Sequence, residues 1–66
     1  MTYKATTVYV MMRETRDQDD NKDYHPVAVF TDLETAEGNT EGYNLSMKEQ
    51  EVDGIRFYIT TTMMYV

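Results

Sequence analysis

The chain opens on a run of residues that alternates as a strand does. Residues 3–13 are dense in β-branched and aromatic side chains, which favour strands. Apolar residues occur on both faces of this predicted strand, a pattern typical of a central strand or of one whose second face meets a partner. One face carries Val8, Val10 and Met12, and the other carries Tyr9 and Met11.

A polar stretch and a second predicted strand follow. Residues 14–25 show no apolar period, which predicts an exposed loop. Pro26 suits the first position of a strand, where a missing N–H does least harm, and Val27 to Phe30 continue that strand. We expect it to lie antiparallel to the first strand, joined to it by a long hairpin.

Helix signals begin directly after the second strand. Thr31 and Glu34 have the spacing of a capping box, so a helix is expected to start at Asp32. Gly38-Asn39 reads as a C-cap and Gly42 as a further break, which predicts a short helix over 32–37, with an extension to residue 41 left open. A longer helix is the rival interpretation, because apolar residues follow a helical period at Leu33, Ala36, Tyr43 and Met47. Two glycines, at about 1 kcal/mol each in a helix interior, weigh against it.

The last third of the chain contains an Asp53-Gly54 pair between β-like runs, which favours a type I′ hairpin. A strand over 43–52 would then pair with 55–66, so that Val52 faces Ile55 and Glu51 faces Arg56. The resulting fold class is α+β, a small antiparallel sheet of three or four strands with one short helix.

Length limits this chain to a single domain, residues 1–66. Hydrophobic residues make up 41%, enough to fold, yet a domain of this size buries only about 60% of its unfolded surface. The chain has no cysteine, which excludes disulfides, a thiolate zinc site and a thiol nucleophile. Oligomerisation is the simplest remaining supplement to stability, so a homodimer is favoured over a monomer.

Composition narrows the functional classes. Twelve Asp and Glu against six Lys and Arg give a net charge of −6, which excludes direct nucleic-acid binding by phosphate neutralisation. No apolar run approaches the roughly 20 residues of a membrane span, and no signal peptide is recognisable. We therefore expect a soluble cytoplasmic domain with no membrane partner.

The negative charge is concentrated in the middle of the chain. All twelve acidic residues fall within 14–53 with only three basic residues, a local net charge of −9. Acidic composition also serves solubility, so a solvated surface and a functional electrostatic surface both remain open. The candidate partner-binding residues form three clusters: Asp17, Asp19, Asp20 and Asp23 in the predicted loop; Glu34, Glu37 and Glu41 on one helical face; and Glu49, Glu51 and Asp53 at a strand period.

No motif indicates catalysis, a metal or a cofactor. The run from Asp17 to Asp23 imitates half of a calcium loop, but Lys22 replaces its glycine and Ala28 its bidentate glutamate. His25 is the only histidine and belongs to no recognisable triad, and the three glycines form no phosphate loop. The chain is therefore expected not to be an enzyme.

One resemblance adds a hypothesis about the partner. The run Val8-Tyr-Val-Met-Met, an acidic stretch and then Val27-Ala-Val-Phe-Thr-Asp-Leu-Glu-Thr-Ala36 resemble a pattern common in very small phage-encoded proteins. The small size, the acidity and the absence of a catalytic signature also resemble phage host-takeover proteins. Some of these are DNA mimics, including a Bacillus phage inhibitor of the nucleoid protein HU. The resemblance implies a non-enzymatic inhibitor, working in the host cytoplasm or nucleoid, whose carboxylates occupy the DNA-binding surface of a basic host protein.

A second functional hypothesis comes from the strand pattern instead of the charge. The apolar strand 55–66 could serve as a free sheet edge, on which a small adaptor or regulator binds its partner by strand addition. Reversing the acidic charges would weaken a DNA mimic and leave such an adaptor unaffected.

Overall fold

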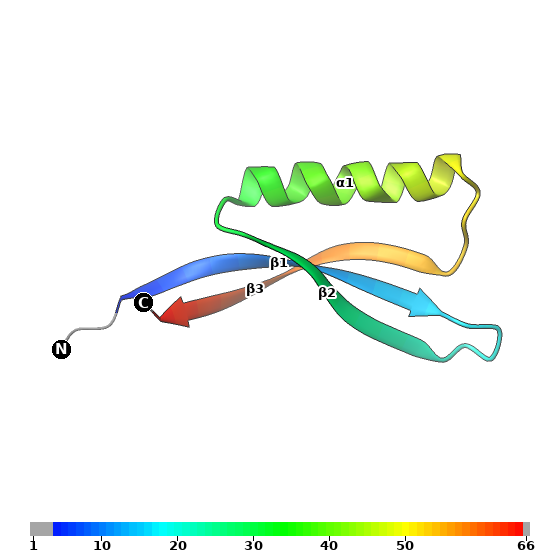
Figure 1. Ribbon diagram of the computed structural model, residues 1–66, viewed down its shortest axis with the longest axis horizontal. Coiled ribbons are helices and arrows are strands. Elements are labelled where there is room, and N and C mark those ends of the chain that lie inside the picture. The colour runs from blue at the N-terminus through cyan, green and yellow to red at the C-terminus, as the bar shows by residue number, and fades with distance from the viewer. Residues whose placement is uncertain (1–3, 66) are drawn as a thin grey trace.

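The computed structural model describes residues 4–65, which form β1 (Ala5–Arg16), β2 (Lys22–Phe30), α1 (Leu33–Glu49) and β3 (Ile55–Tyr65). The strands make one antiparallel sheet in the order β2-β1-β3, and α1 lies along one side of it (Figure 1). The α+β class and the central position of the first strand are confirmed. Tyr3 and Val66, the outermost residues of the predicted strands, lie outside the described residues.

The β1–β2 hairpin is tighter than predicted, and the expectation of a loop over 14–25 is wrong. Both strands continue into that range and leave a short turn over 17–21. The carboxylate of Asp17 accepts the N–H groups of Asp19 and Asn21, both at 2.9 Å, and Asp20 takes a positive φ of 65°. These local hydrogen bonds close the turn without any apolar residue, so an apolar period could not reveal where the strands end.

Pro26 lies in the middle of β2 instead of at its start. It stands opposite Met12, and the adjacent Val27 is an extra residue in β2, because Met11 pairs with Ala28 while Met12 pairs with Pro26. Since β2 is an edge strand and this position directs its nitrogen away from β1, no ladder hydrogen bond is lost.

The helix is the longer of the two alternatives, and the short helix over 32–37 is wrong. Its N-cap is Asp32 and not Thr31, because the Asp32 carboxylate accepts the N–H of Thr35 at 2.8 Å and the Thr35 hydroxyl at 2.7 Å. The helix passes through Gly38 and Gly42. A Cβ atom added to either glycine would meet no neighbouring side chain or strand within 4 Å, so the helix does not require glycine there. Contacts with the sheet compensate for the low helix propensity of these glycines.

The predicted hairpin at Asp53-Gly54 is also wrong, because residues 43–49 belong to α1 and the pair lies between a helix and a strand. Gly54 instead directly precedes β3: its carbonyl accepts the N–H of Arg16 at 2.7 Å, and its φ is 83°. A Cβ here would lie 2.8 Å from the carbonyl oxygen of Arg16. Gly54 is therefore required by close backbone approach and positive φ, and the turn motif misidentified its role.

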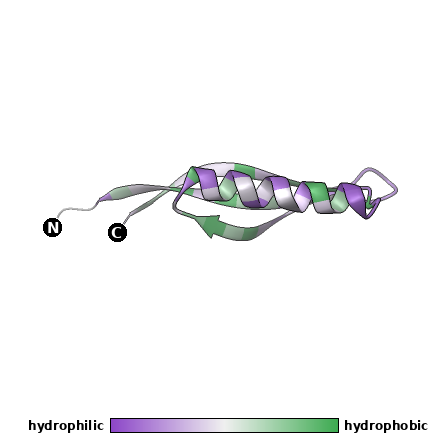
Figure 2. Cartoon of the chain, turned by 90° about the horizontal axis from the view of Figure 1, so that it is seen from above, coloured by the Kyte–Doolittle hydropathy of each residue, from purple (hydrophilic) through white to green (hydrophobic). Residues whose placement is uncertain are grey.

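The core lies between α1 and one face of the sheet. The ring of Phe57 in β3 lies 5.0 Å from that of Tyr43 in α1, and Phe57 shares its sheet face with Met11. Met11, Ala36 and Phe57 are the buried apolar residues of this core in the described chain, and Val8 is buried on the opposite face of the sheet. This is a small core, and the helix surface seen from above mixes hydrophobic with hydrophilic residues (Figure 2).

The side chain of Asn44 fastens α1 to the outer edge of β3. Its amide nitrogen donates to the carbonyl of Phe57, and its oxygen accepts the N–H of Phe57, both at 2.9 Å. The backbone groups of Phe57 thus point away from β1 and find their partner on the helix.

Candidate functional site

Seven of the ten predicted partner-binding residues lie at one end of the molecule. The β1–β2 turn and the α1–β3 connection both reach this end (Figure 1). We call these seven side chains the acidic end: Asp17, Asp19, Asp20, Asp23, Glu49, Glu51 and Asp53. The structure therefore brings together two clusters that are far apart in sequence.

Backbone contacts join the two segments of the acidic end. The Arg16–Gly54 hydrogen bond links the start of the turn to the end of the connection. Asp17 and Asp53 line the same shallow hollow, together with Gln18 and Ile55. The strand row expected for Glu49, Glu51 and Asp53 is wrong: Glu49 ends the helix, and Glu51 has a positive φ of 56° in the connection.

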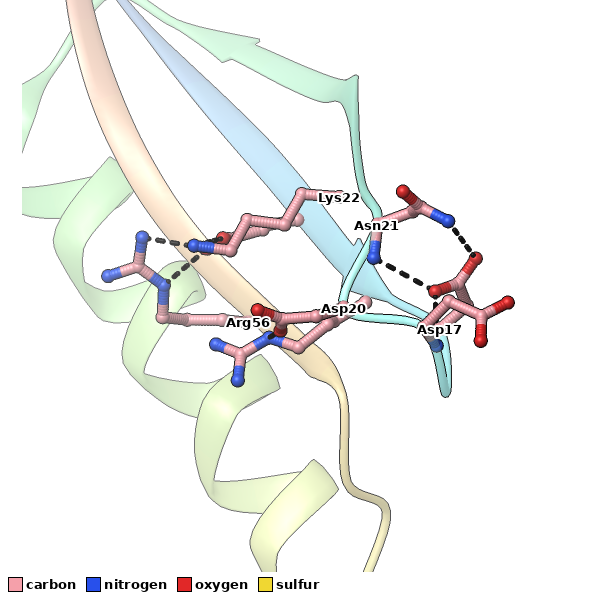
Figure 3. A network of polar contacts seen from close by, with 8 residues as sticks. Asp17, Asp20, Asn21, Lys22 and Arg56 are labelled. Carbon is pink, nitrogen blue, oxygen red and sulfur yellow. Dashed lines mark hydrogen bonds and ion pairs between the residues drawn. The ribbon is translucent and has the colours of Figure 1, made fainter.

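Asp17 has a structural role within the acidic end. Besides the two backbone N–H groups, its carboxylate accepts the side-chain amide of Asn21 at 3.3 Å (Figure 3). The backbone hydrogen bond from Asn21 is the main cause that lowers the pKa of Asp17. Asp17 is thus held ionised, and its carboxylate oxygens are directed into the turn. It therefore adds to the negative electrostatic potential of the acidic end more than it offers a direct contact to a partner.

Most of the acidic end is not neutralised by the cations of the described chain. Arg16 pairs with Asp20 at 3.4 Å, and both side chains are largely exposed. Lys22 and Arg56 form ion pairs with Glu14 instead. Among residues 4–65, the other six carboxylates of the acidic end have no salt-bridge partner, so this end keeps its negative potential.

Glu14 is a site residue that the sequence analysis did not single out. It is buried, and its carboxylate accepts Arg56 Nε at 2.8 Å and lies 3.7 Å from Lys22 Nζ. The hydrogen bond from Arg56 is the main cause that lowers its pKa, and the charges of Arg56 and Lys22 act in the same direction. The alternation of side chains along the first strand could have indicated this burial, because Glu14 lies on the same face as Val10 and Met12.

The remaining three candidates, Glu34, Glu37 and Glu41, lie along α1 away from the acidic end. Their common helical face is confirmed by the length of the helix. Glu37 and Glu41 border a shallow hollow with Lys48 and Ile59. The helix acids are therefore a separate, sparser surface.

The histidine and the calcium-loop imitation noted in the sequence also have defined positions in the structure. His25 is exposed in β2, opposite Arg13. Within residues 4–65, no three His, Asp or Glu side chains are grouped so that they could hold a metal ion. The calcium-loop imitation is the β1–β2 turn, whose first carboxylate, Asp17, is occupied by amide donors.

Comparison with models of protein families, with curated proteins and with solved structures finds no match. In the part of the chain that the structure describes, α1 is too short and too polar for a membrane-spanning helix.

Proposed function

We propose that this chain is a non-enzymatic inhibitor that binds a basic DNA-binding protein of its host through the acidic end and competes there with DNA. Carboxylates at the acidic end pair with Lys and Arg side chains that otherwise hold phosphates. The observation that carries the proposal is the convergence of seven exposed carboxylates from two segments, six of them without a cation among residues 4–65. The host cytoplasm or nucleoid is the corresponding location.

Rigidity of the acidic end supports the proposal. The turn is closed by the Asp17 hydrogen bonds, and the connection is fixed to it through Arg16 and Gly54. A preorganised set of charges loses less entropy on binding than charges on a mobile tail. Like charges held together also repel one another, a cost that is compensated when a basic partner binds.

Competition with DNA is the direct test. The probes are purified HU bound to a fluorescent DNA duplex, and a nuclease-treated bacterial lysate from which immobilised protein captures its partners. We expect the chain to release the duplex from HU, or to capture another DNA-binding protein that excess duplex and raised salt displace. Capture that resists both duplex and salt would contradict the proposal.

Two triple variants with the same change in charge distinguish the acidic end from a general charge effect. The acidic-end variant carries Asp19→Asn, Glu51→Gln and Asp53→Asn. The control carries Glu34→Gln, Glu37→Gln and Glu41→Gln. We expect the first to weaken competition at least about tenfold, since charge-assisted hydrogen bonds contribute about 1.5–3 kcal/mol each, and the second to have a small effect. Equal loss in both would show that net charge alone governs binding.

A further inference from the structure

The outer edge of β3 is an open template for strand pairing. Because Phe57 directs its N–H and C=O outward to Asn44, every second residue after it does the same. The outward residues that remain are Ile59, Thr61, Met63 and Tyr65. Among residues 4–65, Asn44 is the side chain that hydrogen-bonds this edge, so these four residues find no partner there.

This part of β3 is exposed and uncharged. Residues 60–65 are all exposed, and no Asp, Glu, Lys or Arg follows Arg56 in the chain. The end of β3 extends past the start of α1 (Figure 1). Exposed edges are usually protected by charges, proline or a covering element, and residues 60–65 have none of these. Ile59, the first residue of the edge, is half-buried and borders α1.

The folded chain is extended and exposes more surface than an average domain of its size. Its accessible surface is 5271 Å², about 900 Å² above the value expected for a folded monomer of 7.8 kDa. Its radius of gyration is 14.4 Å, against about 11 Å for a compact domain of this length. The excess area is close to the roughly 800 Å² that each partner contributes to a standard protein interface.

We propose that β3 pairs antiparallel with β3 of a second copy of this chain, with Thr62 opposite Thr62 at the two-fold axis. This register uses all four outward residues at once, since Ile59 then bonds to Tyr65 and Thr61 to Met63 across the interface. Phe57 stays outside the pairing because Asn44 occupies its backbone groups. The result is a continuous six-stranded sheet with an isologous interface.

Charge does not oppose a second copy at this edge even though each copy carries −6. The acidic end lies beside Ile55, and Thr62 is seven residues further along β3, about 24 Å at the usual strand rise. The two acidic ends of the dimer are then about 48 Å apart along the strands, well beyond the screening length of about 8 Å at physiological salt. Pairing through the uncharged segment therefore avoids repulsion between the two acidic ends.

Cysteine cross-linking tests the register, because the chain has no cysteine of its own. Thr62→Cys places two thiols at a non-hydrogen-bonded pair with Cα atoms about 4.5 Å apart, within the range of a disulfide. We expect it to form a covalent dimer under mild oxidation. Thr60→Cys and Met64→Cys should each form no covalent dimer alone and cross-link when mixed. Cross-linking of Thr60→Cys with itself, or none in Thr62→Cys, would overturn the register.

Sedimentation equilibrium tests the interface itself. Thr61→Pro removes an outward N–H and leaves the β1–β3 ladder intact, whereas Thr61→Val keeps that N–H and is the control. We expect Thr61→Pro to sediment as a folded monomer, verified by circular dichroism, and Thr61→Val to remain dimeric. A wild-type chain that stays monomeric at every concentration would refute the dimer. A dimer that survives Thr61→Pro, or an edge occupied by a strand of another protein, would refute this interface.

Discussion

Asn44 pairs with both backbone groups of Phe57, in the manner of a neighbouring strand. A single side chain from α1 thus supplies one step of sheet pairing at the edge of β3, and at the same point the Phe57 ring packs against Tyr43. The helix is joined to the sheet by an apolar contact and a polar one directed at the same residue. This pairing fixes the tilt of α1 and limits where another strand can add.

Replacing Asn44 by Ala should therefore lower the stability of the fold. Two partly buried backbone groups lose their partner, which costs about 1–3 kcal/mol. Asn39→Ala is the matched control, because the Asn39 side chain bonds only the Thr35 carbonyl within the helix. Urea unfolding followed by circular dichroism measures both variants, and equal stability of wild type and Asn44→Ala would contradict the role assigned to this residue.

Replacing glycine by alanine is expected to lower the stability of the fold at one position and to raise it at two others. Gly54→Ala should destabilise the fold by about 2 kcal/mol or more, because its φ is 83° and the new Cβ would meet the Arg16 carbonyl. Gly38→Ala and Gly42→Ala should each stabilise it by about 0.5–1 kcal/mol, since both positions are helical and open. Thermal unfolding of the three variants checks the ordering, which would fail if Gly54→Ala were neutral.

The identity of the N-cap can be tested by two adjacent substitutions. Asp32→Ala removes the acceptor of the Thr35 N–H and hydroxyl and should lower the melting temperature by about 4–8 °C. Thr31→Ala should leave it nearly unchanged, since Thr31 lies outside the cap. A larger decrease in melting temperature for Thr31→Ala than for Asp32→Ala would instead support Thr31 as the N-cap, as the capping box in the sequence predicts.

Acid should weaken the stabilising effect of Glu14. Its pKa is lowered from 4.5 in the folded chain, chiefly by the hydrogen bond from Arg56, so the unfolded chain binds a proton first as pH falls. The contribution is complete above pH 4.5 and declines as pH falls through the folded pKa. Glu14→Gln should be less stable than wild type near neutral pH, and this difference should shrink in acid. A difference that does not change with pH would show that Glu14 is not held ionised.

Strand and helix formation follow the sequence closely where packing and alternation agree. The first strand was predicted as central because both faces are apolar, and Met11 and Val8, on opposite faces, are both buried. The helix could not be delimited locally, because Gly38 and Gly42 oppose it and only tertiary contacts such as Asn44 with Phe57 overcome them. The helical period at Tyr43 and Met47 correctly indicated the longer helix, and the cost of the two glycines outweighed it in the sequence analysis.

The sequence shows which acidic residues form clusters, but it does not show which clusters come together in the folded chain. The acidic residues of the turn and of the connection are separated by α1 in sequence, and the Arg16–Gly54 hydrogen bond places them together. Such a long-range backbone contact has no local signature. Glu14 shows the reverse situation, since its position in the strand alternation could have indicated a buried carboxylate that requires cations such as Arg56.

Pro26 and the extra residue Val27 have a consequence for how far this sheet can grow. They interrupt the outer side of β2, the edge opposite to β3, so that a further strand finds neither a regular ladder nor a full set of donors there. A sheet with one interrupted edge can gain partners in one direction only. Once two copies share their β3 edges, growth stops, and a chain rich in strand-forming residues avoids polymerising into fibres.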